Sequence, residues 1–303
     1  MYDLIVIGGG PAGITAGIYA IRKKLNTLLV SKDFVGQAGE SSLIENWPGE
    51  KHISGAELLL KMRNHLEGLG AEIKQEEVKN IEKNDSFLVE TSEGNNYRAR
   101  AVIVASGALP RSLGIKGEKE FVGRGVSYCA ICDAPFFDQK TVAVIGGGNS
   151  GLETALDLTK YAKKIYILEF SPKIKADEVL QERVRKETKI EIILEAQAQE
   201  IKGDSAVKEL VYIDRKTQKE KVLKVDGVFV QIGRIPASQF IKNGLVDLTK
   251  RGEVQIDPST NQTKTPGLFA AGDVTSILYK QIIIAAGEGA KAALSCYSYL
   301  KQG

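Results

Sequence analysis

The sequence has few of the features that mark several common classes of protein. Its three cysteines are too few for the disulfide framework of a small secreted domain. The net charge is only +3, and 41 basic residues are scattered among 38 acidic ones, which argues against a nucleic-acid-binding surface. No segment is apolar for long enough to cross a bilayer. We therefore expect a soluble protein with no nucleic-acid or membrane partner.

The chain is long enough to bury two hydrophobic cores. It has 303 residues, of which 43% are hydrophobic and 26% are charged, as is typical of globular proteins. Two domains are expected at this length. The first apolar strand begins almost at the N-terminus, with Leu4-Ile5-Val6-Ile7, so we expect no signal peptide and a cytoplasmic location.

One order of elements occurs twice along the chain. The first copy has an apolar strand at residues 3–7, then Gly8-Gly9-Gly10-Pro11-Ala12-Gly13, a helix to about residue 24 and a strand at 27–30. The second copy has a strand at 141–145, then Gly146-Gly147-Gly148-Asn149-Ser150-Gly151, a helix at about 152–161 and a strand at 165–168. The chain therefore contains an internal structural repeat.

Both glycine clusters are predicted to bind dinucleotides. Glycine lets the backbone approach a pyrophosphate closely, and the N-terminus of the following helix offers free N–H groups. Pro11 fits the first turn of a helix, where its missing N–H costs nothing. A glycine pattern alone often belongs to an ordinary loop, but here an apolar strand precedes each cluster and a helix follows it.

An acidic residue distinguishes the second copy from the first. Glu169 stands about twenty residues after the second glycine cluster, where a carboxylate accepts hydrogen bonds from both ribose hydroxyls and repels a 2′-phosphate. This favours NADH over NADPH. The alternative is that Glu169 simply faces solvent. The first copy has Ser31-Lys32-Asp33 at this place, so its ribose contact is less clear.

A pair of cysteines, Cys129-Ala130-Ile131-Cys132-Asp133, precedes the second glycine cluster. Two residues between cysteines is the spacing that closes a reactive disulfide. The alternatives are two inert thiols or half of a zinc site. Asp133 is a candidate proton donor or acceptor, and also a candidate helix N-cap.

A zinc site would need a second pair of ligands. Only Cys296 and the two histidines, His52 and His65, are left, and their spacing is not that of a metal site. Cys296 stands in a segment rich in alanine and leucine and is expected to be a thiol of the core.

The remaining segments complete the expected organisation. Crossings between the domains are expected after Pro110 and near residues 241–245, and Gly272-Asp273 is a third candidate for an anion or ribityl site. The other expected elements are a helix at 56–70, a turn at 93–96, strands at 101–105, 227–233 and 267–271, and a helix from about 280 to 300.

Taken together, these residues resemble the low-molecular-weight thioredoxin reductases over almost the whole chain. In that family the cysteine pair lies just before the second glycine cluster, whereas in the lipoamide dehydrogenase and glutathione reductase type it follows the first. The resemblance is carried by Gly8 to Gly13, Glu45-Asn46-Trp47-Pro48-Gly49, Ser106-Gly107-Ala108, Cys129 to Asp133, Gly146 to Gly151 and Ala270-Ala271-Gly272-Asp273.

The second half is similar to the flavoprotein subunit of alkyl hydroperoxide reductase. That relative uses NADH and has an additional N-terminal thioredoxin-like module, so here the electrons are expected to leave to a separate protein. The chain departs from the thioredoxin reductase pattern at Ala134, where glycine is usual, and lacks the basic cluster of the NADPH-using members of that family. The similar runs are 148–151, 168–170, 175–177, 229–233 and 279–284.

The resemblance implies an α/β fold with two Rossmann-like, three-layer (ββα) domains. The FAD-binding domain comprises residues 1–111 and 245–303, and the inserted NAD(P)H-binding domain comprises residues 112–244 and carries the redox disulfide. The implied catalytic residues are Cys129, Cys132 and Asp133. The cofactor-binding residues are expected to be Gly8, Gly10, Pro11, Ala12, Gly13, Gln37, Asn46, Ser106, Gly107, Gly146, Gly148, Asn149, Ser150, Glu169, Gly233, Gly272, Asp273, Lys280, Gln281 and Ile282.

The implied activity is transfer of electrons from NADH through FAD and the disulfide to a thioredoxin- or glutaredoxin-like protein, or to a carrier linked to a peroxiredoxin. Cys132 is expected to face the flavin and Cys129 to attack the partner, with a rotation of the inserted domain between the two half-reactions. A homodimer is expected, and no metal. The alternatives are an NADH oxidase that produces hydrogen peroxide and a flavin-loaded redox sensor that does not turn over.

Overall fold

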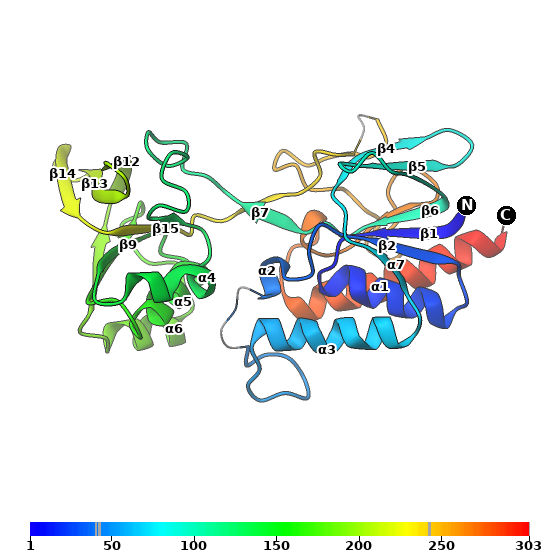
Figure 1. Cartoon of the computed structure of the whole chain (residues 1–303), viewed down its shortest axis with the longest axis horizontal. Helices are drawn as coiled ribbons and strands as arrows, with labels where there is room; N and C mark the ends of the chain where they lie inside the picture. Colours follow the sequence, from blue (N-terminus) through cyan, green and yellow to red (C-terminus); the bar gives the residue numbers. More distant parts are fainter. Residues whose placement is uncertain (40, 42–43, 242–243, 303) are drawn as a thin grey trace. The chain divides into compact units, whose positions relative to one another are not determined.

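The chain divides into two compact units, one inserted into the other. The computed structural model describes residues 1–39, 41, 44–241 and 244–302. The first unit is Met1–Leu109 with Ile235–Gly303, and the second is Pro110–Arg234. Each unit is drawn in Figure 1 and is described below by itself.

The first unit is built on a seven-stranded sheet with the order β3-β2-β1-β6-β5-β4, and β17 pairs with the C-terminal half of β6. Strands β1, β2, β3, β6 and β17 are parallel, and β4 and β5 form an antiparallel extension. The bounds are β1 (Tyr2–Ile7), β2 (Thr27–Val30), β3 (Glu72–Lys74), β4 (Val78–Lys83), β5 (Phe87–Thr91), β6 (Asn96–Val104) and β17 (Leu268–Ala270).

Both faces of this sheet are covered, which explains the uninterrupted apolar run of β1. Side chains alternate between the two faces along β1. Leu4 and Val6 therefore pack in the core that the helices cover, and Ile5 and Ile7 pack in the core on the opposite face of the sheet. The helices of the first core are α1 (Pro11–Arg22), α3 (Gly55–Gly68) and α7 (Ile282–Gln302), which lie together on one side of the sheet (Figure 1). Two short helices, α2 (Gly36–Gly39) and η2 (Gly272–Val274), complete the unit.

The second unit repeats this plan with a five-stranded parallel sheet, order β11-β10-β9-β15-β8. Helices pack on one face, and an antiparallel sheet of β12, β13 and β14 packs on the other. The strands are β8 (Val126–Ser127), β9 (Thr141–Ile145), β10 (Lys164–Glu169), β11 (Ile190–Leu194), β12 (Ala196–Gly203), β13 (Val207–Asp214), β14 (Lys219–Lys224) and β15 (Gly227–Val230). The helices are α4 (Ala130–Asp133), η1 (Ala134–Phe137), α5 (Asn149–Leu158) and α6 (Glu178–Arg185). The prediction of two three-layer Rossmann-like domains is confirmed.

The chain passes between the units along two short paired strands, β7 (Ala108–Pro110) and β16 (Arg234–Pro236). The first crossing was expected here, but the second lies earlier than the expected residues 241–245. Ile241 is buried in the core of the first unit, and the Ile81 N–H donates to the Phe240 carbonyl at 3.2 Å, so the chain has already joined that unit by Phe240. Residues 242 and 243 lie outside the described residues.

Two helix starts also differ from expectation. Helix α5 begins at Asn149 rather than near residue 152, because Gly148 already serves as its extended N-cap. Helix α7 begins at Ile282 rather than at residue 280. In the described part of the chain, no helix has the length and apolar character needed to span a membrane.

Two neighbouring glycines of α7 provide a test of the packing between α1 and α7. A β-carbon at Gly289 would lie 2.0 Å from the Ala12 carbonyl oxygen, whereas one at Gly287 would meet nothing within 4 Å. We expect Gly289→Ala to lower the free energy of unfolding by about 1–3 kcal/mol through overpacking. The matched control Gly287→Ala should raise it by about 0.5–1 kcal/mol, because alanine favours the helix. Denaturant unfolding measures both, and equal effects would contradict the tight helix contact.

Candidate functional site

The first glycine cluster forms a cradle that side chains would fill. Gly8 has a φ of +118°, and a β-carbon there would lie 2.2 Å from the Ala105 carbonyl oxygen. A β-carbon at Gly13 would lie 1.9 Å from the Gly8 carbonyl oxygen. Helix α1 begins at Pro11 after an extended Gly10 that makes no side-chain cap. The first N–H groups of the helix are therefore left for a ligand, as a pyrophosphate site requires.

The second cluster reproduces this geometry. Gly146 has a φ of +121°, and a β-carbon there would lie 2.1 Å from the Gln231 carbonyl oxygen. A β-carbon at Gly151 would lie 2.0 Å from the Gly146 carbonyl oxygen. Gly148 is the extended N-cap of α5, again without a side-chain cap. Both cradles therefore fit a dinucleotide pyrophosphate.

Segments distant in the sequence meet around the first cradle. A β-carbon at Gly272, whose φ is +76°, would lie 3.0 Å from the Ala12 side chain, so η2 lies against the start of α1. The Asn46 amide donates to the Gln281 side chain at 3.1 Å. Lys280 donates to the carbonyl oxygens of Thr275 at 2.5 Å and Asp273 at 3.4 Å.

Four other expected residues of the first unit, Ser106, Gly107, Gln37 and Ile282, have contacts or positions outside the glycine cradle itself. The Ser106 hydroxyl donates to the Ala237 carbonyl at 2.6 Å, and the Ala237 N–H donates to the Gly107 carbonyl at 3.0 Å. Gln37 is exposed on α2, and Ile282 is the first residue of α7. Ser106 and Gly107 therefore attach the end of β6 to the returning chain just after β16.

Glu169 lies directly beside the second cradle. Its side chain is buried, with 8% exposed. One carboxylate oxygen accepts from the Gly147 N–H at 2.7 Å and the other from the Ser171 N–H at 2.8 Å. The alternative that Glu169 faces solvent is therefore wrong. A β-carbon at Gly147 would lie 2.8 Å from the carboxylate, so glycine is needed there as well.

The loop after Glu169 is attached to the second cradle by further hydrogen bonds. The Lys175 N–H donates to the Gly147 carbonyl at 3.1 Å. Asn149 and Asp177 form a reciprocal pair, in which the Asn149 amide donates to the Asp177 carboxylate at 2.9 Å and accepts from the Asp177 N–H at 2.8 Å.

Two other predicted residues of the second unit do not belong to this loop. Ser150 is exposed on the first turn of α5, and the Gly233 carbonyl accepts from the Arg111 N–H at 3.0 Å.

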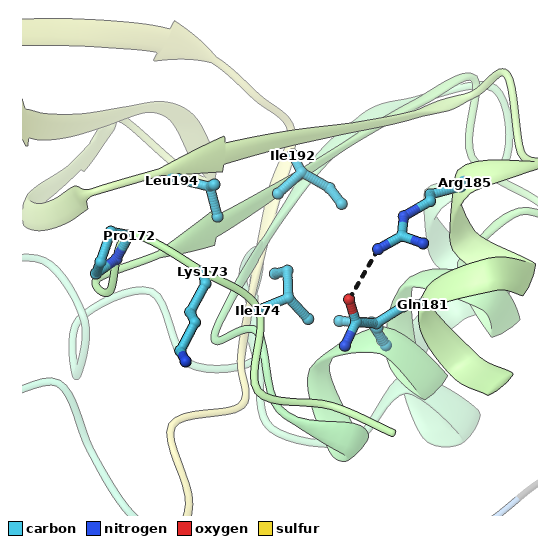
Figure 2. Close-up of a pocket in the computed structure, with 8 residues that line it drawn as sticks. Pro172, Lys173, Ile174, Gln181, Arg185, Ile192 and Leu194 are labelled. Carbon is cyan, nitrogen blue, oxygen red and sulfur yellow. Dashed lines mark hydrogen bonds between the residues drawn. The ribbon is translucent and has the colours of Figure 1, made fainter. Parts of the chain in front are cut away.

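A cavity of about 460 Å³ lies beside this loop, between it, α6 and β11 (Figure 2). Its walls are mainly apolar, and Lys173 and Arg185 supply positive charge. The Arg185 guanidinium donates to the Gln181 side chain at 3.0 Å. The lining residues are Leu152, Pro172, Lys173, Ile174, Gln181, Arg185, Ile192 and Leu194.

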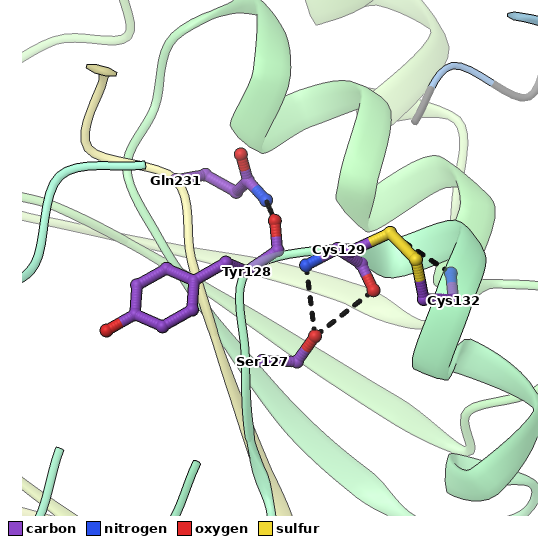
Figure 3. The surroundings of a disulfide bond; sticks show 5 residues. All are labelled: Ser127, Tyr128, Cys129, Cys132 and Gln231. Carbon is purple, nitrogen blue, oxygen red and sulfur yellow. Dashed lines mark hydrogen bonds between the residues drawn. A yellow bond between two sulfur atoms is a disulfide. The ribbon is translucent and has the colours of Figure 1, made fainter. Parts of the chain in front are cut away.

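Cys129 and Cys132 are joined in a disulfide at the start of α4 (Figure 3). Cys129 is half-buried, and its sulfur accepts from the Cys132 N–H at 3.2 Å, while Cys132 is exposed. The pair therefore forms a disulfide rather than two separate thiols. In the part of the chain that the structure describes, no three His, Cys, Asp or Glu side chains are grouped to hold a metal ion.

Asp133 does not cap a helix with its side chain. It occupies the N-cap position of η1 without a side-chain hydrogen bond to that helix. Its N–H donates to the Cys129 carbonyl at 3.3 Å. Asp133 is thus an N-cap by position but not by a side-chain hydrogen bond, and the proton-transfer role stays a prediction.

A hydrogen-bond network behind the disulfide was missed from the sequence. Glu118 is fully buried and accepts from the N–H groups of Leu113 and Gly114, each at 2.7 Å, and from the Tyr128 hydroxyl at 2.8 Å. Burial and the hydrogen bond to Glu118 raise the pKa of Tyr128 to about 12. The Gln231 amide donates to the Tyr128 carbonyl at 3.1 Å (Figure 3).

This network connects Tyr128 to residues near both crossings. Leu113 and Gly114 lie just after the first crossing, and Gln231 lies just before the second. Only the position of Tyr128 next to Cys129 was a signal for it in the sequence, because Glu118 stands in an ordinary polar run.

The geometry agrees with what known proteins show. A family model described as pyridine nucleotide-disulphide oxidoreductase matches residues 2–290, so the chain belongs to that family. Two solved thioredoxin reductases are similar to it, and this confirms the resemblance and the fold. That of Lactococcus lactis has a TM-score of 0.95 and 38% identity, covering 100% of both chains. That of T. acidophilum has a TM-score of 0.92 and 40% identity, covering 98% of both.

Curated relatives are longer than this chain. The NADH dehydrogenase of Bacillus subtilis (strain 168) is 42% identical over 300 residues, which is 99% of this chain and 58% of the relative. A subunit of the alkyl hydroperoxide reductase of Pseudomonas aeruginosa is 42% identical over 305 residues, again 99% of this chain and 58% of the relative. The chain thus spans less than two thirds of the length of these relatives.

The third cysteine gives a test of the site assignment. Cys296 is fully buried on α7, and burial raises its pKa to about 12, so the thiol stays protonated and shielded at neutral pH. After reduction of the native protein we expect iodoacetamide at pH 8 to modify two thiols, and a third only in denaturant. Mass spectrometry counts the adducts, and the Cys296→Ala variant should lose the third. Rapid modification of three thiols in the folded protein would refute the assignment of Cys296 to the core.

Proposed function

We propose that the protein is a flavoprotein disulfide reductase that passes electrons from NADH through FAD and the Cys129–Cys132 disulfide to a thioredoxin-like or glutaredoxin-like protein. The observation that carries the proposal is a disulfide at the start of a short helix, in the same unit as a dinucleotide cradle. A second cradle of the same geometry lies in the other unit.

The first cradle is proposed to hold FAD. Gly8 and Gly13 leave space for the pyrophosphate, and the neighbouring η2 offers Gly272 and Asp273 to the rest of the molecule. When bound, FAD supplies the chemistry that takes a hydride from NADH and passes an electron pair to a disulfide. Lys280 stabilises the η2 segment by donating hydrogen bonds to the carbonyl oxygens of Asp273 and Thr275.

The disulfide is proposed to be the exit for electrons. Reduction breaks the S–S bond and adds two electrons and two protons, giving the thiols of Cys129 and Cys132. The Cys129 thiolate then attacks a disulfide sulfur of the partner, and Cys132 attacks the mixed disulfide, which re-forms the internal bond and releases the partner as a dithiol. Asp133, adjacent to Cys132, is proposed to exchange protons with the thiols.

The two crossings are proposed to act as a hinge. The nucleotide and the disulfide belong to one unit, and turning this unit about β7 and β16 would present them to the flavin in turn. The Glu118–Tyr128–Gln231 network supports the idea, because it connects the disulfide segment to chain next to both crossings. The homodimer and the cytoplasmic location remain predictions from the resemblance.

An NADH oxidase that produces hydrogen peroxide is the second candidate. The name NADH dehydrogenase of one relative favours it, because it mentions no protein substrate. The disulfide in the same unit as the second cradle favours the disulfide reductase. A sensor that does not turn over has no observation in its favour.

The assignment of the cysteines has a direct test. We expect Cys132→Ser to reduce turnover with a thioredoxin-like disulfide protein to background, while NADH still bleaches the flavin absorbance, because only the exit for electrons is removed. The matched control Cys296→Ser should keep wild-type turnover. Full reduction of the partner by Cys132→Ser would overturn the assignment, and a protein with no flavin band even after FAD is added would overturn the flavoprotein proposal.

The preference for NADH has a test at Glu169. A 2′-phosphate beside this buried carboxylate costs on the order of a few kcal/mol, so kcat/KM should favour NADH by roughly a hundredfold. Glu169→Ala should shift the ratio toward NADPH. Lys173, which lines the neighbouring cavity, softens the preference if it reaches the phosphate, so Lys173→Ala serves as the companion variant. Equal use of both nucleotides by the wild type would remove Glu169 from the explanation.

A further inference from the structure

The two cradles can be compared position by position. Ile7 pairs with Val30 across the first sheet as Ile145 pairs with Leu168 across the second. The Gly8 N–H donates to the Val30 carbonyl at 2.8 Å, and the Gly146 N–H donates to the Leu168 carbonyl at 2.9 Å. The next residue in each copy is therefore the structural equivalent, so Ser31 stands where Glu169 stands.

The contact with the middle glycine confirms this equivalence. A β-carbon at Gly9 would lie 2.8 Å from the Ser31 hydroxyl oxygen, and one at Gly147 would lie 2.8 Å from the Glu169 carboxylate. Ser31 is as buried as Glu169, each with 8% exposed. The difference is chemical, because one oxygen is neutral and the other belongs to an anion.

The hydrogen bonds at the two positions also differ. The Gly147 N–H donates to Glu169, whereas within the described part of the chain the Gly9 N–H has no acceptor. The Ser31 hydroxyl donates to the Asp33 carbonyl at 2.5 Å, which leaves its oxygen free only to accept. A ribose hydroxyl finds one neutral acceptor there instead of a carboxylate.

Among the described residues that flank Ser31 in the sequence, the only acid is Asp33, and its carboxylate is engaged with the backbone. Asp33 is exposed, and its Oδ1 accepts from the N–H groups of Val35 at 3.1 Å and Gly36 at 2.9 Å, which begins α2. The other neighbour, Lys32, is a cation whose exposed pair with Glu77, at 3.1 Å, is weak. Glu76 donates its N–H to the Ser31 carbonyl at 3.0 Å, and its carboxylate accepts from Asn95 and Tyr97. Ser31 therefore offers a neutral acceptor beside a cation, Lys32, while the acids around it are engaged in other contacts.

We propose that Ser31 is a specificity-determining residue of the first cradle, which accepts an adenosine ribose with or without a 2′-phosphate, whereas Glu169 makes the second cradle reject the phosphate. The inference rests on the proposed binding of FAD to the first cradle. It implies that the first cradle holds FAD through the pyrophosphate and the parts of the molecule beyond it, rather than through hydrogen bonds from the ribose to a charged side chain.

The test uses the full-length protein stripped of flavin. FAD is titrated back, and its change in fluorescence is followed in competition with ADP-ribose or 2′-phospho-ADP-ribose, so that only the first cradle is reported. We expect the two competitors to have inhibition constants within about threefold of each other, because no like charge meets the phosphate. Ser31→Glu should weaken the phosphorylated competitor by roughly tenfold or more relative to ADP-ribose.

Three further variants make the experiment decisive. Ser31→Asp repeats the charge with a shorter side chain in case glutamate impairs folding. Ser31→Ala should keep the ratio of the wild type, and Glu169→Ser, in the other cradle, should leave it unchanged. Rejection of the phosphorylated competitor by the wild type would overturn the inference about Ser31 but not the proposed function. An unchanged ratio of the two inhibition constants in both acidic variants would do the same. A stripped protein that never rebinds FAD would overturn the proposed function and the inference together.

Discussion

Both units depend on the close approach of one backbone segment to another at a glycine. In each cradle a carbonyl oxygen stands about 2 Å from where a β-carbon would be, at Gly13 against Gly8 and at Gly151 against Gly146. A β-carbon would push the helix away from the strand, and the free N–H groups at the helix start would no longer point at one place. The position of α1 and α5 against the preceding strands, and with it each proposed nucleotide site, depends on keeping this approach.

The same constraint lets the two copies diverge elsewhere. The cradle geometry is almost identical, while the residue at the end of the second strand differs: Ser31 directly follows β2 in one copy, and Glu169 is the last residue of β10 in the other. Each is set against a glycine, and each therefore presents a single oxygen to the same place relative to the cradle. A change at that one side chain would alter the charge beside the proposed ribose position without disturbing the glycine contacts of the cradle.

The disulfide is supported by structure that does not itself take part in the chemistry. Glu118 is buried with four hydrogen-bond acceptor positions to satisfy, and it receives two backbone N–H groups and the Tyr128 hydroxyl. A buried carboxylate that lost these donors would be costly, so the network fixes the chain on both sides of it. Tyr128 is adjacent to Cys129, and the position of the redox pair thus depends on residues near the crossings.

Local sequence determined most of the fold and the positions of the two glycine clusters and the cysteine pair. The apolar runs of β1 and β9, the two glycine clusters and the cysteine pair are short patterns whose geometry depends on near neighbours, so they were predicted in place. Tertiary structure decided what depends on the path of the chain. It brought Asn46 to Gln281, buried Ile241 in the first unit and so moved the second crossing to Ile235, and placed Glu118 beneath Tyr128. No local pattern encodes these contacts, because each one forms only after distant segments have packed.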